Sequence, residues 1–107
     1  IGKTKALELL MTGDMIDAAE AHRLGLVNYV MPMGEEMAKA KELLQKIATK
    51  GPLAITEVIA SVNAYFQPAA DGFQAEVDGF GRVTQTEDFR EGAQAFIEKR
   101  RANFKGA

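Results

Sequence analysis

The sequence predicts a mainly α-helical protein of about six helices with one short extended segment. Apolar residues recur at helical spacing through almost all of the 107 residues, as they do in helices that bury one face. Glycine and proline divide these runs into short helices, and only one short stretch is rich in β-branched and aromatic residues. A chain of this length is at most one domain.

The first two predicted helices are short. Residues 6–11 carry the apolar positions of the first, and Gly13 can end it in the left-handed conformation. Asp17 and Glu20 stand three residues apart, which is the spacing of a capping box. They open a second helix that runs through Leu24 and stops at the following glycine.

Residues 26–30 are predicted to be extended, and Pro32 closes this segment. One strand cannot form a sheet by itself. Its backbone hydrogen bonds must therefore go to a partner outside the chain, unless the segment is only an extended connector. The sequence leaves both possibilities open.

The third and fourth helices are amphipathic and are separated by Gly51 and Pro52, which suits the first turn of a helix. The apolar face of the third helix contains Met37, Ala40, Leu44 and Ile47. That of the fourth contains Ile55, Val58, Ile59 and Val62, and the helix ends near Tyr65, Phe66 and Pro68.

The fifth helix carries Phe73, Val77 and Phe80 on its apolar face. Gly79 and Gly81 flank the last of these and weaken the helix by about 1 kcal/mol each relative to alanine. Glycines at these positions would allow a partner or a ligand to approach the backbone closely.

The last helix is predicted to begin after Thr86, which can cap it, with Glu87 and Asp88 in its first turn. Its apolar face contains Phe89, Ala93 and Phe96. Lys99, Arg100 and Arg101 are placed in its last turn, where cations are favoured.

The composition excludes several classes of protein. A formal net charge of −2 gives no field that would attract nucleic acid or anionic lipid. The absence of cysteine excludes disulfides and thiolate metal sites, and it fits a cytoplasmic location. No apolar run reaches the roughly 18 residues of a membrane span. Because the chain opens at Ile1 without a methionine or a signal region, we expect it to be a piece of a longer protein.

Few residues suggest catalysis. His22 is the only histidine, and a solvated or capping role is expected for it. One histidine without cysteine argues against a metal site. The acidic pairs at 35–36 and 87–88 stand at helix starts, where they are interpreted as structural. No phosphate-binding glycine loop is present.

The basic cluster formed by Lys99, Arg100, Arg101 and Lys105 has two possible roles. It can be a solvated helix end that complements the helix dipole. It can also be an anion or phosphate site, because Phe96 lies one turn before Lys99 and offers a ring to a base.

Several stretches resemble, in order and spacing, the enoyl-CoA hydratase/isomerase (crotonase) family over the whole chain. They are residues 10–14 (LMTGD), 16–21 (IDAAEA), 24–28 (LGLVN), 52–54 (PLA), 86–92 (TEDFREG), 95–100 (AFIEKR) and 104–106 (FKG). The resemblance identifies the chain as a C-terminal segment of such a protein. The resemblance implies that residues 1–32 are the end of the crotonase core and a connector. It implies that residues 33–107 are a helical region that contacts other subunits and coenzyme A.

The family has an N-terminal α/β spiral core, and its C-terminal helices drive formation of trimers or dimers of trimers. The resemblance implies a lyase of fatty acid β-oxidation that adds water across the 2,3 double bond of an enoyl-CoA. A backbone oxyanion hole would stabilise the enolate, and two glutamates would activate the water. The resemblance places these groups before Ile1, so no catalytic residue is expected here and the isolated segment is expected to be inactive.

The resemblance also implies a substrate contact. Phe80 and Phe96 match aromatic residues that line the adenine end of coenzyme A, and Lys99 matches a lysine near the phosphorylated ribose. No separate cofactor is implied, since coenzyme A enters as part of the substrate. Enoyl-CoA isomerase chemistry and a non-catalytic helical oligomerisation module remain the alternatives.

Overall fold

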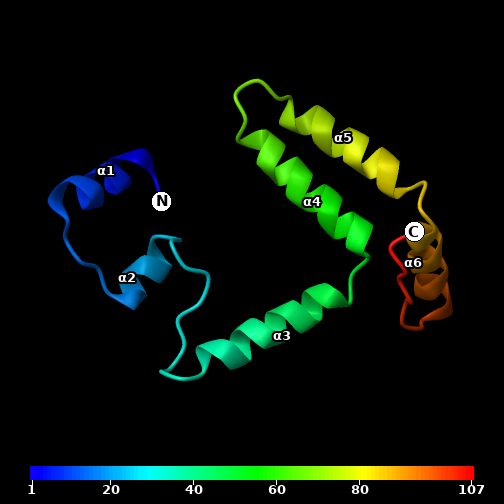
Figure 1. The fold of residues 1–107 in the computed structure, drawn as a ribbon, viewed down its shortest axis with the longest axis horizontal. Coiled ribbons are helices and arrows are strands. Elements are labelled where there is room, and N and C mark those ends of the chain that lie inside the picture. Colours follow the sequence, from blue (N-terminus) through cyan, green and yellow to red (C-terminus); the bar gives the residue numbers. More distant parts are fainter. The chain divides into compact units, whose positions relative to one another are not determined.

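The computed structural model describes residues 1–107 and contains six α-helices and no strand (Figure 1). The helices are α1 (Lys3–Thr12), α2 (Ala18–Arg23), α3 (Glu36–Ala48), α4 (Pro52–Tyr65), α5 (Gly72–Val83) and α6 (Glu87–Glu98). The predicted mainly α class is thereby confirmed. Two compact units, Ile1–Glu42 and Leu43–Ala107, divide inside α3. The boundary predicted after residue 32, between the end of the core with its connector and the helical contact region, stays a prediction.

In the first unit, the ends of α1 and α2 follow from their capping residues. Gly13 adopts a φ of 69°, and its N–H donates to the carbonyl of Leu9 at the end of α1. The carboxylate of Asp17 accepts from the backbone N–H of Glu20 at 2.7 Å and so caps α2. The predicted capping box is only half formed, because the Glu20 carboxylate instead binds Arg23 through two bonds of 2.6 Å.

Residues 26–30 form an irregular segment. A strand is defined by hydrogen bonds to a neighbouring strand, whereas the backbone bond here runs from the N–H of Leu26 to the carbonyl of Ala21 in α2, at 2.9 Å. Both roles predicted for the segment, pairing with a partner outside the chain and simple connection, stay predictions. Tyr29 in this segment lies beneath the ammonium group of Lys39, 5.1 Å from the ring centroid.

In the second unit, α4 and α5 form an antiparallel hairpin and make the most extensive helix–helix contact (Figure 1). The side chain of Asp71 caps α5 by accepting from two backbone N–H groups. Across the hairpin the guanidinium of Arg82 donates to both carboxylate oxygens of Glu57, at 2.9 and 2.7 Å. This fork fixes how the two helices are aligned along each other.

Gly79 makes the close contact between α4 and α5 possible. It is buried, and a Cβ there would lie 3.1 Å from the Glu57 carboxylate and 3.3 Å from the Ser61 hydroxyl. The close approach predicted at this glycine is therefore made by α4. No atom lies within 4 Å of a Cβ placed at Gly81, so nothing within the chain approaches the second predicted position.

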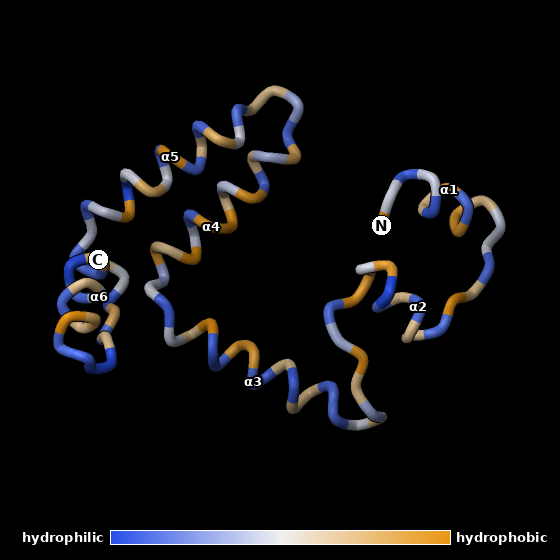
Figure 2. Tube along the Cα trace, turned by 180° about the vertical axis from the view of Figure 1, so that it is seen from behind, coloured by the Kyte–Doolittle hydropathy of each residue, from blue (hydrophilic) through white to orange (hydrophobic).

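The helices leave most of their apolar side chains exposed. Figure 2 shows hydrophobic positions recurring along α3, α4 and α5. Apart from two buried glycines, however, Ala95 is the only buried apolar residue. On the hairpin, Val62 is 55% exposed and Phe73 is 75% exposed. The α4–α5 hairpin therefore has apolar side chains that its own unit does not cover. None of the helices combines the length and the apolar character needed to cross a bilayer.

Candidate functional site

The candidate site begins at the end of α6, where the chain reverses its direction. Thr86 caps the start of α6 through its hydroxyl, as predicted. The helix ends at Glu98, and Lys99 has a φ of 54°, the only positive φ among the non-glycine residues. The N–H of Lys99 donates to the carbonyl of Phe96, and the N–H of Arg100 donates to that of Ala95. These two bonds form a Schellman motif.

The predicted placement of Lys99, Arg100 and Arg101 in the last turn of this helix is wrong. The left-handed conformation of Lys99 ends the helix one residue earlier, because it turns the chain out of the helical path. These cations consequently belong to the tail formed by residues 99–107.

The tail folds back along α6 and is held there by Asp88. One carboxylate oxygen of Asp88 accepts from the N–H of Lys105 at 2.6 Å, and the other accepts from that of Gly106 at 2.8 Å. Its own N–H donates to the carbonyl of Ala107. Asp88 is 6% exposed and is the only buried charged residue. It is structural, as interpreted from the sequence, but it anchors the tail in addition to standing in the first helical turn.

Glu91 is the second anchor of the tail. Its carboxylate receives two bonds from the guanidinium of Arg100, at 2.6 and 2.8 Å, and a third from the N–H of Asn103 at 2.7 Å. The bonds from Arg100 and then that from Asn103 lower the pKa of Glu91 to about 2. Arg100 also binds Glu98, so its charge is matched by two carboxylates.

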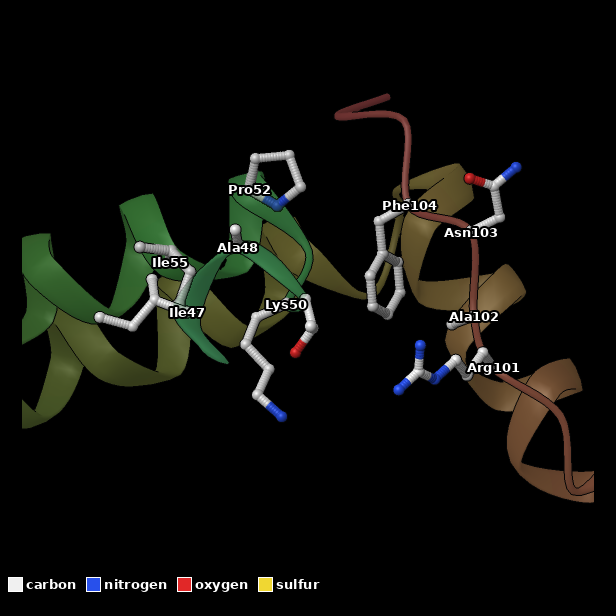
Figure 3. Close-up of a pocket in the computed structure, with 10 residues that line it drawn as sticks. Ile47, Ala48, Lys50, Pro52, Ile55, Arg101, Ala102, Asn103 and Phe104 are labelled. Atoms are coloured by element: carbon white, nitrogen blue, oxygen red, sulfur yellow. The ribbon is translucent and has the colours of Figure 1, made fainter. Parts of the chain in front are cut away.

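Phe104 is the apolar anchor. A Cβ placed on Gly92 of α6 would lie 3.3 Å from its ring, and one placed on Gly51 before α4 would lie 3.6 Å away. The two glycines therefore make room for the ring. Phe104 also lines a hollow of about 710 Å³ between the tail, the end of α3 and the start of α4, where Lys50 and Arg101 lie as well (Figure 3).

The structure separates the three residues predicted to contact coenzyme A into two places. Phe80 lines a hollow of about 700 Å³ between α4 and α5. Phe96 is 86% exposed and lines another hollow, of about 390 Å³, beside α6. Lys99 follows directly at the end of α6 and forms no ion pair. Phe89 lines the hollow of Phe96, and its ring meets that of Phe80 edge-on, with centroids 6.5 Å apart.

In the basic cluster, Arg100 forms ion pairs with Glu91 and Glu98. The other three cations, Lys99, Arg101 and Lys105, form no ion pair. Sequence reasoning did not find the roles of Asp88, Glu91 and Phe104 as tail anchors. The sequence contains only a weak signal for these roles, namely that Asp88 stands one helical turn before Glu91 and that Gly92 lies on the same helix.

Comparisons with known proteins cover the whole chain. The model of the enoyl-CoA hydratase/isomerase family matches residues 1–107. Crotonyl-CoA hydratase of Syntrophomonas wolfei is 41% identical over 105 residues, which are 97% of this chain and 40% of that protein. The mitochondrial enoyl-CoA hydratase of Pongo abelii is 38% identical over 106 residues, which are 98% of this chain and 37% of that protein.

Solved structures agree with these sequence matches. The crystal structure of enoyl-CoA hydratase from Bacillus anthracis has a TM-score of 0.93 and 39% identity, covering 100% of this chain and 42% of that one. The chain thus spans about two fifths of the length of these relatives. With a family model that matches every residue, the chain belongs to the enoyl-CoA hydratase/isomerase family.

Proposed function

We propose that this chain is the C-terminal helical segment of an enoyl-CoA hydratase, which adds water across the 2,3 double bond of an enoyl-CoA thioester. The catalytic groups of that enzyme would lie outside these 107 residues. The match of the whole chain to the family model carries this proposal. The names of the relatives, among them a crotonyl-CoA hydratase, favour hydration over the other activities of the family.

The end of α6 would supply part of the coenzyme A pocket. Phe96 presents an exposed ring on which adenine can stack, and Lys99 is a cation that no carboxylate neutralises. Phe80 would contribute a second aromatic surface from the hollow beside α5. Coenzyme A would enter as part of the substrate, without a separate cofactor.

The hairpin of α4 and α5 would supply contacts between subunits of a trimer or a dimer of trimers. Its hollow is lined mainly by apolar residues, and Val77 and Tyr65 are 63% and 68% exposed. Burial of such a surface in an obligate assembly is favourable at about 25 cal/mol per Å². A cytoplasmic location would suit this enzyme, and fractionation of cells that produce it would test that.

The test is an assay of the intact protein that contains this chain. We expect it to hydrate crotonyl-CoA, with loss of the conjugated thioester's absorbance. Phe96→Ala and Lys99→Ala should each raise KM for crotonyl-CoA by about tenfold and change kcat little, because they remove binding that is equal in the ground and transition states. Failure to hydrate any short- or medium-chain enoyl-CoA would exclude the hydratase.

Two other functions have specific support. The matched family includes isomerases by its description, so movement of a double bond in a 3-enoyl-CoA is the first alternative. The exposed apolar faces favour a non-catalytic helical oligomerisation module as the second. Formation of a 2-enoyl-CoA from a 3-enoyl-CoA would identify the isomerase, and assembly without activity on any acyl-CoA would identify the module.

A further inference from the structure

Lys99 lies between two fixed points of the chain. Glu98, the residue before it, is the last residue of α6 and binds Arg100, the residue after it. Arg100 is in turn held by both carboxylate oxygens of Glu91. The backbone on both sides of this lysine is thereby tied to α6.

The conformation of Lys99 needs such support. A side chain with a Cβ is disfavoured in the left-handed region, and it stays there only where surrounding contacts determine it. The Schellman bonds of Lys99 and Arg100 favour this turn locally. The contacts made by the tail beyond residue 100 add long-range support to it.

We propose that Glu91 and Asp88 are positioning residues of the coenzyme A site: they hold the tail against α6 and so fix the point from which the Lys99 side chain leaves the helix beside Phe96. This inference rests on the proposed coenzyme A contact. Glu91 acts on the near part of the tail, through Arg100 and Asn103. Asp88 acts on its far end, through Lys105 and Gly106.

The two carboxylates themselves are unsuited to touch the substrate. Every oxygen of Asp88 and Glu91 accepts a hydrogen bond from the protein, and their negative charge would repel the phosphates of coenzyme A. Any effect of these residues on the affinity for coenzyme A must therefore pass through the tail.

The experiment compares two substrates of the intact protein, crotonyl-CoA and crotonyl-pantetheine. The second has the same reacting thioester and lacks the adenosine and phosphates. Glu91→Gln, which weakens the fork to Arg100, should raise KM for crotonyl-CoA by about tenfold and leave kcat nearly unchanged. It should not change KM for crotonyl-pantetheine. Asp88→Asn should change KM in the same direction.

Glu20→Gln is the matched control. Glu20 also receives two bonds from an arginine, Arg23, but this pair lies within α2, whereas Asp88 and Glu91, which hold the tail, lie on α6. It should leave KM unchanged for both substrates. Arg100→Lys is a milder variant for use if the carboxylate variants fold poorly, since it keeps the charge and loses the bidentate geometry. It should raise KM for crotonyl-CoA by a smaller factor.

A double mutant separates positioning from general stability. With Lys99 already replaced by alanine, adding Glu91→Gln should raise KM for crotonyl-CoA no further. An equal rise of KM for both substrates, or no rise where Lys99→Ala alone gives one, would overturn the positioning role and leave the coenzyme A contact standing. If Lys99→Ala itself has no effect on KM, the proposed contact fails and the positioning role fails with it.

Discussion

The α4–α5 hairpin and the α6–tail region are held together by different forces. In the hairpin, a glycine contact and one fork between Glu57 and Arg82 join two helices whose apolar side chains stay largely exposed. In the α6–tail region, buried Asp88 and half-buried Glu91 satisfy the backbone of the tail. The hairpin surface therefore remains available to other chains, whereas the carboxylates of the tail are used internally.

The largest effect that follows from this comparison concerns assembly. Val62→Asp places a charge on the exposed apolar face of α4, and burial of an unpaired charge between subunits is strongly unfavourable. We expect the mass of the intact protein, measured by light scattering, to fall to that of a monomer. Asn63→Asp adds the same charge at the next, already polar position and should leave the mass unchanged. Retention of the assembly by the Val62 variant would place the interface elsewhere.

Asp88→Ala should produce the largest loss of stability. It leaves the N–H groups of Lys105 and Gly106 without their acceptor, at a cost of about 3 kcal/mol. Urea denaturation would measure the loss, and amide exchange should show the faster opening at these two residues. Asp71→Ala is the comparison in the hairpin: it removes a helix cap and should cost about 1 kcal/mol. Equal losses in the two variants would remove the contrast between the regions.

Two glycines of α5 give a sharper test of the hairpin. Gly81→Ala should stabilise the protein by about 1 kcal/mol, because it adds helix propensity where a Cβ meets no atom. Gly79→Ala gains the same propensity but must displace the Glu57 carboxylate, 3.1 Å from the new Cβ, and with it the fork to Arg82. The melting temperature of the Gly79→Ala variant should therefore be lower than that of the Gly81→Ala variant. The reverse order would mean that the fork adjusts without cost.

The sequence predicted the helices well and the tail poorly, for a physical reason. Helix ends at Gly13 and Thr86 depend on neighbouring residues, so local patterns reveal them. The partners of Asp88 lie 17 and 18 residues away, and no periodicity encodes such a contact. The error at Lys99 has a different cause, since the left-handed conformation that ends α6 there is usually adopted by glycine, and a lysine gives no such signal in the sequence.

Acid should act on the α6–tail region through Glu91. Because its folded pKa of about 2 lies below the ordinary value of 4.5, ionised Glu91 stabilises the folded state fully above pH 4.5. This contribution is lost as the pH falls toward 2, where the carboxylate takes up a proton and weakens its bonds to Arg100 and Asn103. The amide resonance of Asn103 should follow that titration, and Glu91→Gln should abolish it. A midpoint near 4.5 would show that the fork to Arg100 is open in solution, and the tail would then be no more firmly held than the hairpin.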